Sequence, residues 1–63
     1  MKVTLKAARV NASLTQKEAA DQLGISPDTL ANYEKGKSFP DVPLIKKIEK
    51  LYHVVYNNII FLT

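Results

Sequence analysis

The sequence predicts an all-α fold, a compact bundle of five short helices. Residues 15–37, TQKEAADQLGISPDTLANYEKGK, show two short helical patterns separated by Gly24 and by a second helix start at Ser26. Segments 3–12 and 41–52 repeat apolar residues at three- and four-residue spacing, which is typical of amphipathic helices. The order of parts over about residues 16–35 is that of a helix-turn-helix.

Length and composition restrict the class of protein. The chain has 63 residues, which is room for one domain, 1–63, with a small core. It has no cysteine, so a disulfide framework and a thiolate zinc site are excluded. No apolar run approaches the ~20 residues that span a bilayer. The formal net charge of +3 suits a polyanionic partner, although a solvated lysine-rich face gives the same balance.

The first two helices are predicted from apolar spacing and caps. Leu5, Ala8 and Ala12 form the apolar stripe of a helix over residues 3–12. Thr15 is a good N-cap for the second helix, and Glu18 completes a capping box. The inner side of this helix is small and apolar, so another helix can cross it closely; it consists of Ala19, Ala20 and Leu23.

The third helix is predicted to start after Ser26, with Pro27 at the first helical position, where its missing amide proton costs nothing. A step of about 100° per residue divides the helix into two arcs. The inner arc faces the core and holds Leu30, Tyr33 and Glu34. The outer arc, where function is expected, holds Asp28, Asn32 and Lys35.

The C-terminal part is predicted to add two helices. Asp41 is the expected N-cap of the fourth, whose apolar arc consists of Leu44, Ile45, Ile48, Leu51 and Tyr52. The composition of residues 54–62 would suit a buried strand. A strand without a partner leaves its backbone unpaired, so a short fifth helix from about Tyr56 to Phe61 is predicted instead.

Taken together, these patterns resemble the phage repressor and Cro-type helix-turn-helix family, the XRE family. The matching pieces are LTQKEAADQLGIS, TLANYEKGK and PDVPLIKKIEKLYHVVYNNII. The likeness is close to short stand-alone regulators of Gram-positive bacteria and their prophages. The resemblance implies sequence-specific binding of double-stranded DNA by a transcriptional regulator, most simply a repressor that binds a palindromic operator as a homodimer in the bacterial cytoplasm, at the nucleoid.

The resemblance also implies roles for particular residues. Gln16 stands where the family fixes a phosphate, whereas Pro27, Asp28 and Asn32 stand where it reads base edges. The implied DNA-binding set is Gln16, Lys17, Ser26, Pro27, Asp28, Thr29, Asn32, Lys35, Lys37 and Ser38. Arg9 and Glu34 match a pair that forms a partly buried salt bridge between the first and third helices.

The sequence departs from the family pattern at four positions. Pro27 cannot make the side-chain hydrogen bonds of the usual glutamine, so base reading shifts to Asp28 and Asn32. Asparagine can pair bidentately with adenine, whereas Asp28 is also accounted for by the helix dipole alone. The other three departures are Ser13 in place of a glycine, Ala8 in place of a leucine, and Val55 in place of a serine or threonine cap.

Several functional alternatives remain open on the sequence. The apolar tail exceeds what a small core needs, which suggests a dimer interface formed by Tyr56, Ile60, Phe61 and Leu62. His53 is the single histidine and lies one turn after Glu49, but no second metal ligand completes a site. We therefore expect no enzyme, no metal, no cofactor and no small-molecule ligand. The alternatives to repression are the antitoxin of a toxin–antitoxin pair and a protein-interaction module that has lost DNA binding.

Overall fold

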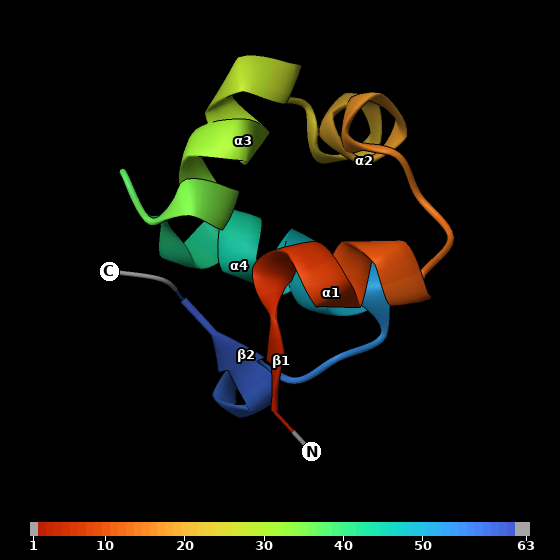
Figure 1. The fold of residues 1–63 in the computed structure, drawn as a ribbon, viewed down its shortest axis with the longest axis vertical. Coiled ribbons are helices and arrows are strands. Elements are labelled where there is room, and N and C mark those ends of the chain that lie inside the picture. The colour runs from red at the N-terminus through yellow and green to blue at the C-terminus, as the bar shows by residue number, and fades with distance from the viewer. Residues whose placement is uncertain (1, 62–63) are drawn as a thin grey trace.

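Four α-helices form the body of the molecule in the computed structural model, which describes residues 2–61. They are α1 (Leu5–Asn11), α2 (Gln16–Leu23), α3 (Pro27–Lys35) and α4 (Val42–Tyr52). Strand β1 (Val3–Thr4) precedes α1, and a single 3₁₀ turn, η1 (Tyr56–Asn58), leads into strand β2 (Ile59–Ile60). Helices α2 and α3 lie at one end of the molecule and the two strands at the other (Figure 1). The predicted all-α class is confirmed, with four α-helices in place of five.

The helix starts follow local side-chain caps. Thr4 caps α1 by accepting from the Ala7 amide at 3.1 Å, so α1 begins two residues later than predicted. Thr15 and Glu18 form the capping box at α2, and Ser26 caps α3. Asp41 caps α4 through the Leu44 amide at 3.0 Å. Each cap satisfies an amide that the first turn of a helix leaves without a partner.

A residue with left-handed backbone conformation follows each α-helix. Gly24 and Gly36 have φ values of 75° and 79°, as expected for glycine after a helix. Ser13 stands where the family has a glycine, and it adopts a φ of 62°. The turn between α1 and α2 is therefore kept at the cost of placing an L-residue in the left-handed region.

The predicted fifth helix is wrong. Residues 56–58 form only one 3₁₀ turn, and Ile59–Ile60 pairs in parallel with Val3–Thr4, with Val3 opposite Ile59 and Thr4 opposite Ile60. A strand at the end of the chain was expected to lack a partner, but the start of the chain supplies one. Val55 makes no side-chain cap for η1; instead Glu49 of α4 accepts from the Tyr56 amide at 2.8 Å.

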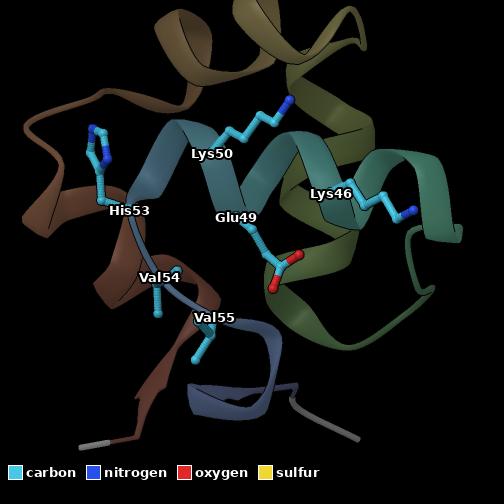
Figure 2. Close-up of a pocket in the computed structure, with 6 residues that line it drawn as sticks. All are labelled: Lys46, Glu49, Lys50, His53, Val54 and Val55. Atoms are coloured by element: carbon cyan, nitrogen blue, oxygen red, sulfur yellow. The ribbon is translucent and has the colours of Figure 1, made fainter.

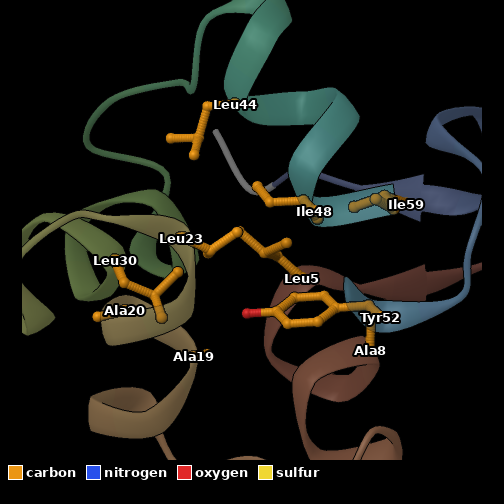
Figure 3. Packing of buried hydrophobic residues seen from close by; sticks show 10 residues of the cluster. All are labelled: Leu5, Ala8, Ala19, Ala20, Leu23, Leu30, Leu44, Ile48, Tyr52 and Ile59. Atoms are coloured by element: carbon orange, nitrogen blue, oxygen red, sulfur yellow. The ribbon is translucent and has the colours of Figure 1, made fainter. Parts of the chain in front are cut away.

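The core lies where the four helices and β2 meet (Figure 3). Leu5, Leu30 and Ile48 are its largest fully buried side chains. Ala19 and Ala20 are completely buried, which lets α3 pack closely on α2. Burial of each large aliphatic side chain contributes roughly 1.5–3 kcal/mol to the stability of the fold. The inner face of α3 is therefore packed in the core, and its outer face is exposed to solvent.

Candidate nucleic-acid interface

The outer face of α3 is polar and exposed. Asp28, Asn32 and Lys35 all lie in solvent, whereas Leu30 on the opposite side is completely buried. Lys17 of α2 is also exposed, and Gln16 is half-buried at the start of that helix. Helices α2 and α3, which carry these residues, lie next to each other at one end of the molecule (Figure 1).

The first turn of α3 is held by its own hydroxyls. Ser26 Oγ accepts from the Thr29 amide at 3.1 Å and lies 2.8 Å from Thr29 Oγ1. Because one hydroxyl must donate to the other, a single hydroxyl proton of the pair remains available to an outside acceptor. Pro27 and Asp28 are exposed beside them. Ser26 and Thr29 thus present one donor jointly, rather than two independent ones.

The end of α3 leads into an exposed basic loop. The Lys37 amide donates to the Asn32 carbonyl at 2.9 Å, and Gly36 takes the left-handed conformation. This closing turn fixes where the loop leaves the helix. Lys35, Lys37 and Ser38 are all exposed there. Two lysines next to a hydroxyl suit contact with a phosphate backbone.

The side chains of Arg9, Glu34 and Gln16 meet between α1, α2 and α3, on the side of α3 opposite its exposed polar face. Arg9 Nε donates to Glu34 Oε2 at 2.7 Å, and Arg9 Nη2 donates to Oε1 at 3.3 Å. Gln16 Nε2 donates to the same Oε1 at 3.0 Å. The hydrogen bond to Glu34 raises the pKa of the Arg9 guanidinium further above its usual range, so the guanidinium stays charged at neutral pH.

The contact between Gln16 and Glu34 was missed by the sequence analysis. Helical periodicity placed Glu34 on the inner arc of its own helix, but it says nothing about which residue of another helix the side chain meets. A further contact of the same kind joins Arg9 Nη1 to the Leu14 carbonyl at 2.9 Å. Arg9 thereby holds the segment that leads into α2.

The N-terminus of α2 is partly occupied by its own capping box. Glu18 Oε1 accepts from the Thr15 amide at 2.9 Å, and Thr15 Oγ1 accepts from the Glu18 amide at 3.1 Å. The bond from the Thr15 backbone lowers the pKa of the Glu18 carboxyl. Helix geometry leaves the amides of the first two helical residues, Gln16 and Lys17, directed toward an outside acceptor.

A second region, on the outer side of α4, is shallow and open to solvent. A depression of about 530 Å³ is lined by Lys46, Glu49, Lys50, His53, Val54 and Val55 (Figure 2). His53 and the Glu49 carboxylate point to opposite sides, and Glu49 is already bonded to the Tyr56 amide. No group of three or more potential ligands that could hold a metal ion occurs within residues 2–61.

The predicted dimer surface is only partly described. Tyr56 is 47% and Ile60 43% exposed, whereas Phe61 is half-buried and Leu62 lies outside the described residues. Phe61 packs against Phe39 with ring centroids 5.9 Å apart, and against Tyr56 at 5.6 Å. Phe39, in the loop after α3, was missed because a single aromatic residue in a loop has no periodic pattern.

Comparison with known proteins assigns a family. A helix-turn-helix family model matches residues 5–54. The chain is 46% identical over 50 residues to the HTH-type transcriptional regulator ImmR of Bacillus subtilis, a match that covers 79% of this chain and 39% of ImmR. It is 41% identical over 59 residues to the uncharacterized HTH-type transcriptional regulator MJ0272 of Methanocaldococcus jannaschii, covering 94% of this chain and 89% of that protein.

A phage protein is also similar. The chain is 37% identical over 46 residues to the cryptic phage CTXphi transcriptional repressor RstR of Vibrio cholerae, covering 73% of this chain and 41% of RstR. This chain thus spans about two fifths of ImmR and of RstR, but most of MJ0272. No solved structure matches the chain. Among the described helices, none is both long and apolar enough to cross a membrane.

Proposed function

The chain belongs to the XRE-type helix-turn-helix family of DNA-binding transcription regulators, and on this premise we propose that it is a phage-type repressor that binds a palindromic operator as a homodimer. The observation that carries the proposal is the division of α3 into a buried face and an exposed polar face, with Leu30 on the first and Asn32 on the second. A helix supported in this way can enter a major groove as a rigid element.

Base reading is proposed for two residues. Asn32 has an exposed amide that can pair bidentately with adenine, and Asp28 can accept from the amino group of cytosine. Pro27 contributes shape alone, since it has no polar side chain. With so few base contacts, sequence-dependent DNA shape is expected to supply part of the specificity.

Phosphate contacts are proposed at two places, the start of α2 and the end of α3. Gln16 and Lys17 lie at the start of α2, while Lys35, Lys37 and Ser38 follow the end of α3. The shared hydroxyl donor of Ser26 and Thr29 lies between them in the sequence. With about 4–6 phosphates neutralised per subunit, affinity should fall steeply with salt.

Dimerisation is proposed through the apolar surface beside η1. Phe39, Tyr56 and Phe61 form an aromatic cluster, with Val42 65% and Ile60 43% exposed. A two-fold contact between two copies would cover these side chains and would place two α3 helices about 34 Å apart on one face of the DNA. The named activity of RstR, transcriptional repression, is in line with the repressor role.

Selection from a random pool of duplexes tests the proposal. The expected result is a palindromic consensus that the protein binds with two subunits and with strong salt dependence. Asn32→Ala should weaken binding to the selected duplex by about 1–3 kcal/mol, whereas Asn11→Ala, at an exposed asparagine on the last turn of α1, should not. Strict 1:1 binding to a half-site would refute the dimer, and salt-independent affinity would refute the phosphate contacts.

The aromatic surface also supports a second candidate function, a protein-interaction module without DNA binding. Phe39 and Tyr56 are exposed aromatic side chains, and aromatic residues are enriched in interfaces. In that case Asp28→Ala and Asn32→Ala would leave the low affinity for any duplex unchanged, and Tyr56→Ala would abolish partner binding. An antitoxin would instead bind both its operator and a toxin encoded by a neighbouring gene.

A further inference from the structure

We propose that Glu34 is a positioning residue for DNA binding: it orients the Gln16 side-chain amide for contact with a phosphate. The inference rests on the proposed function, since it deepens the role of one DNA contact. Glu34 lies on the inner face of α3 and is only 7% exposed, so it does not touch DNA itself. Its effect on binding would pass through Gln16, which is half-buried at the start of α2.

The carboxylate of Glu34 is shared between a charge partner and Gln16. Its Oε2 accepts from Arg9 Nε at 2.7 Å, and its Oε1 accepts from both Arg9 Nη2 at 3.3 Å and Gln16 Nε2 at 3.0 Å. Oε1 is therefore closer to the amide nitrogen of Gln16 than to the guanidinium nitrogen of Arg9.

This contact decides which end of the Gln16 amide turns inward. A carboxylate oxygen can only accept, so it selects the amide nitrogen and excludes the amide oxygen from the inner position. One N–H of the amide is used by Glu34. The other N–H and the carbonyl oxygen remain for an outside partner, and the N–H suits a phosphate oxygen. An amide already fixed in this way loses less rotamer freedom when DNA binds.

Arg9 makes this arrangement compatible with a polyanion. A lone carboxylate directly behind a phosphate contact would repel the phosphate, but the Arg9 guanidinium balances its charge. Arg9 Nη1 also donates to the Leu14 carbonyl at 2.9 Å, two residues before Gln16. The same pair thus fixes the backbone that enters α2, the Gln16 side chain and the helix α3 relative to one another.

The test must separate positioning from general support of the fold. Glu34→Gln keeps the size of the side chain but has one carbonyl oxygen where the carboxylate has two accepting oxygens. It cannot hold Arg9 and Gln16 in the same way, whereas it removes fewer contacts than Glu34→Ala. Thermal melts establish that each variant is folded at the temperature of the binding measurement.

The first measurement uses the protein without DNA. Nuclear magnetic resonance of the Gln16 side-chain amide should show two separate hydrogen resonances displaced from those of Gln22, an exposed glutamine on the same helix. Glu34→Gln should move the Gln16 resonances toward the Gln22 values. Gln16 resonances that stay unchanged in Glu34→Gln would show that Glu34 does not orient the amide, and would overturn the proposal.

The second measurement is a double-mutant cycle on affinity for a mixed-sequence duplex about three helical turns long, because a phosphate contact does not depend on sequence. Glu34→Gln should weaken binding about five- to tenfold in the wild-type background. In a Gln16→Ala background the same substitution should change affinity less than about twofold. Gln22→Ala serves as the matched control and should leave affinity unchanged.

The outcomes separate the positioning role from the proposed function. Equal weakening by Glu34→Gln in both backgrounds would mean that Glu34 acts only through the fold, and would overturn the proposal while DNA binding stands. No effect of Gln16→Ala on a protein that binds DNA would overturn it as well. A wild-type protein that binds no duplex even at low salt would refute the proposed function, and the positioning role would fall with it.

Discussion

Replacing Glu34 by alanine should destabilise the folded protein by about 2–4 kcal/mol, because it leaves a buried guanidinium without its counter-ion. The side chains of Glu34 and Arg9 are only 5% and 9% exposed, and three N–H groups donate to the Glu34 carboxylate. After the substitution, Arg9 keeps the Leu14 carbonyl as its hydrogen-bond acceptor.

The size of this loss can be set against the stability of the whole chain. Native domains are stable by roughly 0.05–0.15 kcal/mol per residue, which gives about 3–9 kcal/mol for a chain of this length. Hydrogen bonds to a charged group contribute about 1.5–3 kcal/mol each when they are lost singly, but the three bonds are not additive. A loss of about 2–4 kcal/mol therefore removes a large part of the stability and lowers the melting temperature by roughly 10–25 °C.

The assay is urea denaturation followed by circular dichroism, with the thermal melt as a second probe. A matched control replaces both partners by apolar residues, Arg9→Met with Glu34→Leu. Since neither charge then remains in the interior, the double variant should recover most of the stability that Glu34→Ala loses.

Two results would refute this reasoning. A loss below about 1 kcal/mol for Glu34→Ala would show that the pair is accessible to water in solution, as exposed ion pairs are. A double variant as unstable as Glu34→Ala would show that an unpaired buried charge does not account for the loss.

Three further predictions concern separate features. Ser13 and His53 have φ values of 62° and 54°, so Ser13→Gly and His53→Gly should each raise the free energy of unfolding by up to about 1 kcal/mol in urea melts, and a loss would contradict the left-handed geometry. The hydrogen bond from the Thr15 amide lowers the pKa of the Glu18 carboxyl in the folded state. The ionised carboxylate therefore stabilises the folded protein above the ordinary pKa of 4.5, and this stabilisation is lost as the pH falls through the lower pKa of the folded state. Glu18→Gln should accordingly lose less stability on acidification than wild type, and an unchanged pH profile would argue against the capping box. Burial raises the pKa of Tyr52 to about 12, and its hydroxyl makes no hydrogen bond with the described residues. Tyr52→Phe should therefore leave the free energy of unfolding unchanged or raise it slightly. A loss above about 1 kcal/mol would show that the hydroxyl is hydrogen-bonded.

Local sequence patterns predicted the structure correctly where it depends on near neighbours along the chain. Thr15, Ser26 and Asp41 were predicted as caps, and each accepts from an amide three residues on. Gly24 was predicted to separate the two helices, and it ends α2 with a positive φ of 75°. These features can be predicted because the interacting groups belong to one helix turn.

Local patterns predicted the wrong element at the end of the chain, where the pairing partner is distant in the sequence. Ile59–Ile60 has the β-branched composition of a strand, but the choice between strand and helix depends on Val3–Thr4 at the other end. Strand pairing satisfies the backbone of both segments, so two marginal sequences form a ladder that neither would form alone. The β-branched pairs at both ends were the signal that could have indicated it.

The sequence by itself determined the helix-turn-helix: its caps, its glycine turn, and the polar outer face of α3 with Asp28 and Asn32. Only the tertiary structure decided how that unit is held and what its side chains offer. The amide of Gln16 and the carboxylate of Glu34, 18 residues apart, meet 3.0 Å from each other because α2 and α3 cross over buried alanines. Local patterns specify the direction of a side chain on its own helix, whereas a contact between helices depends on their relative placement, which the packing of the whole core sets.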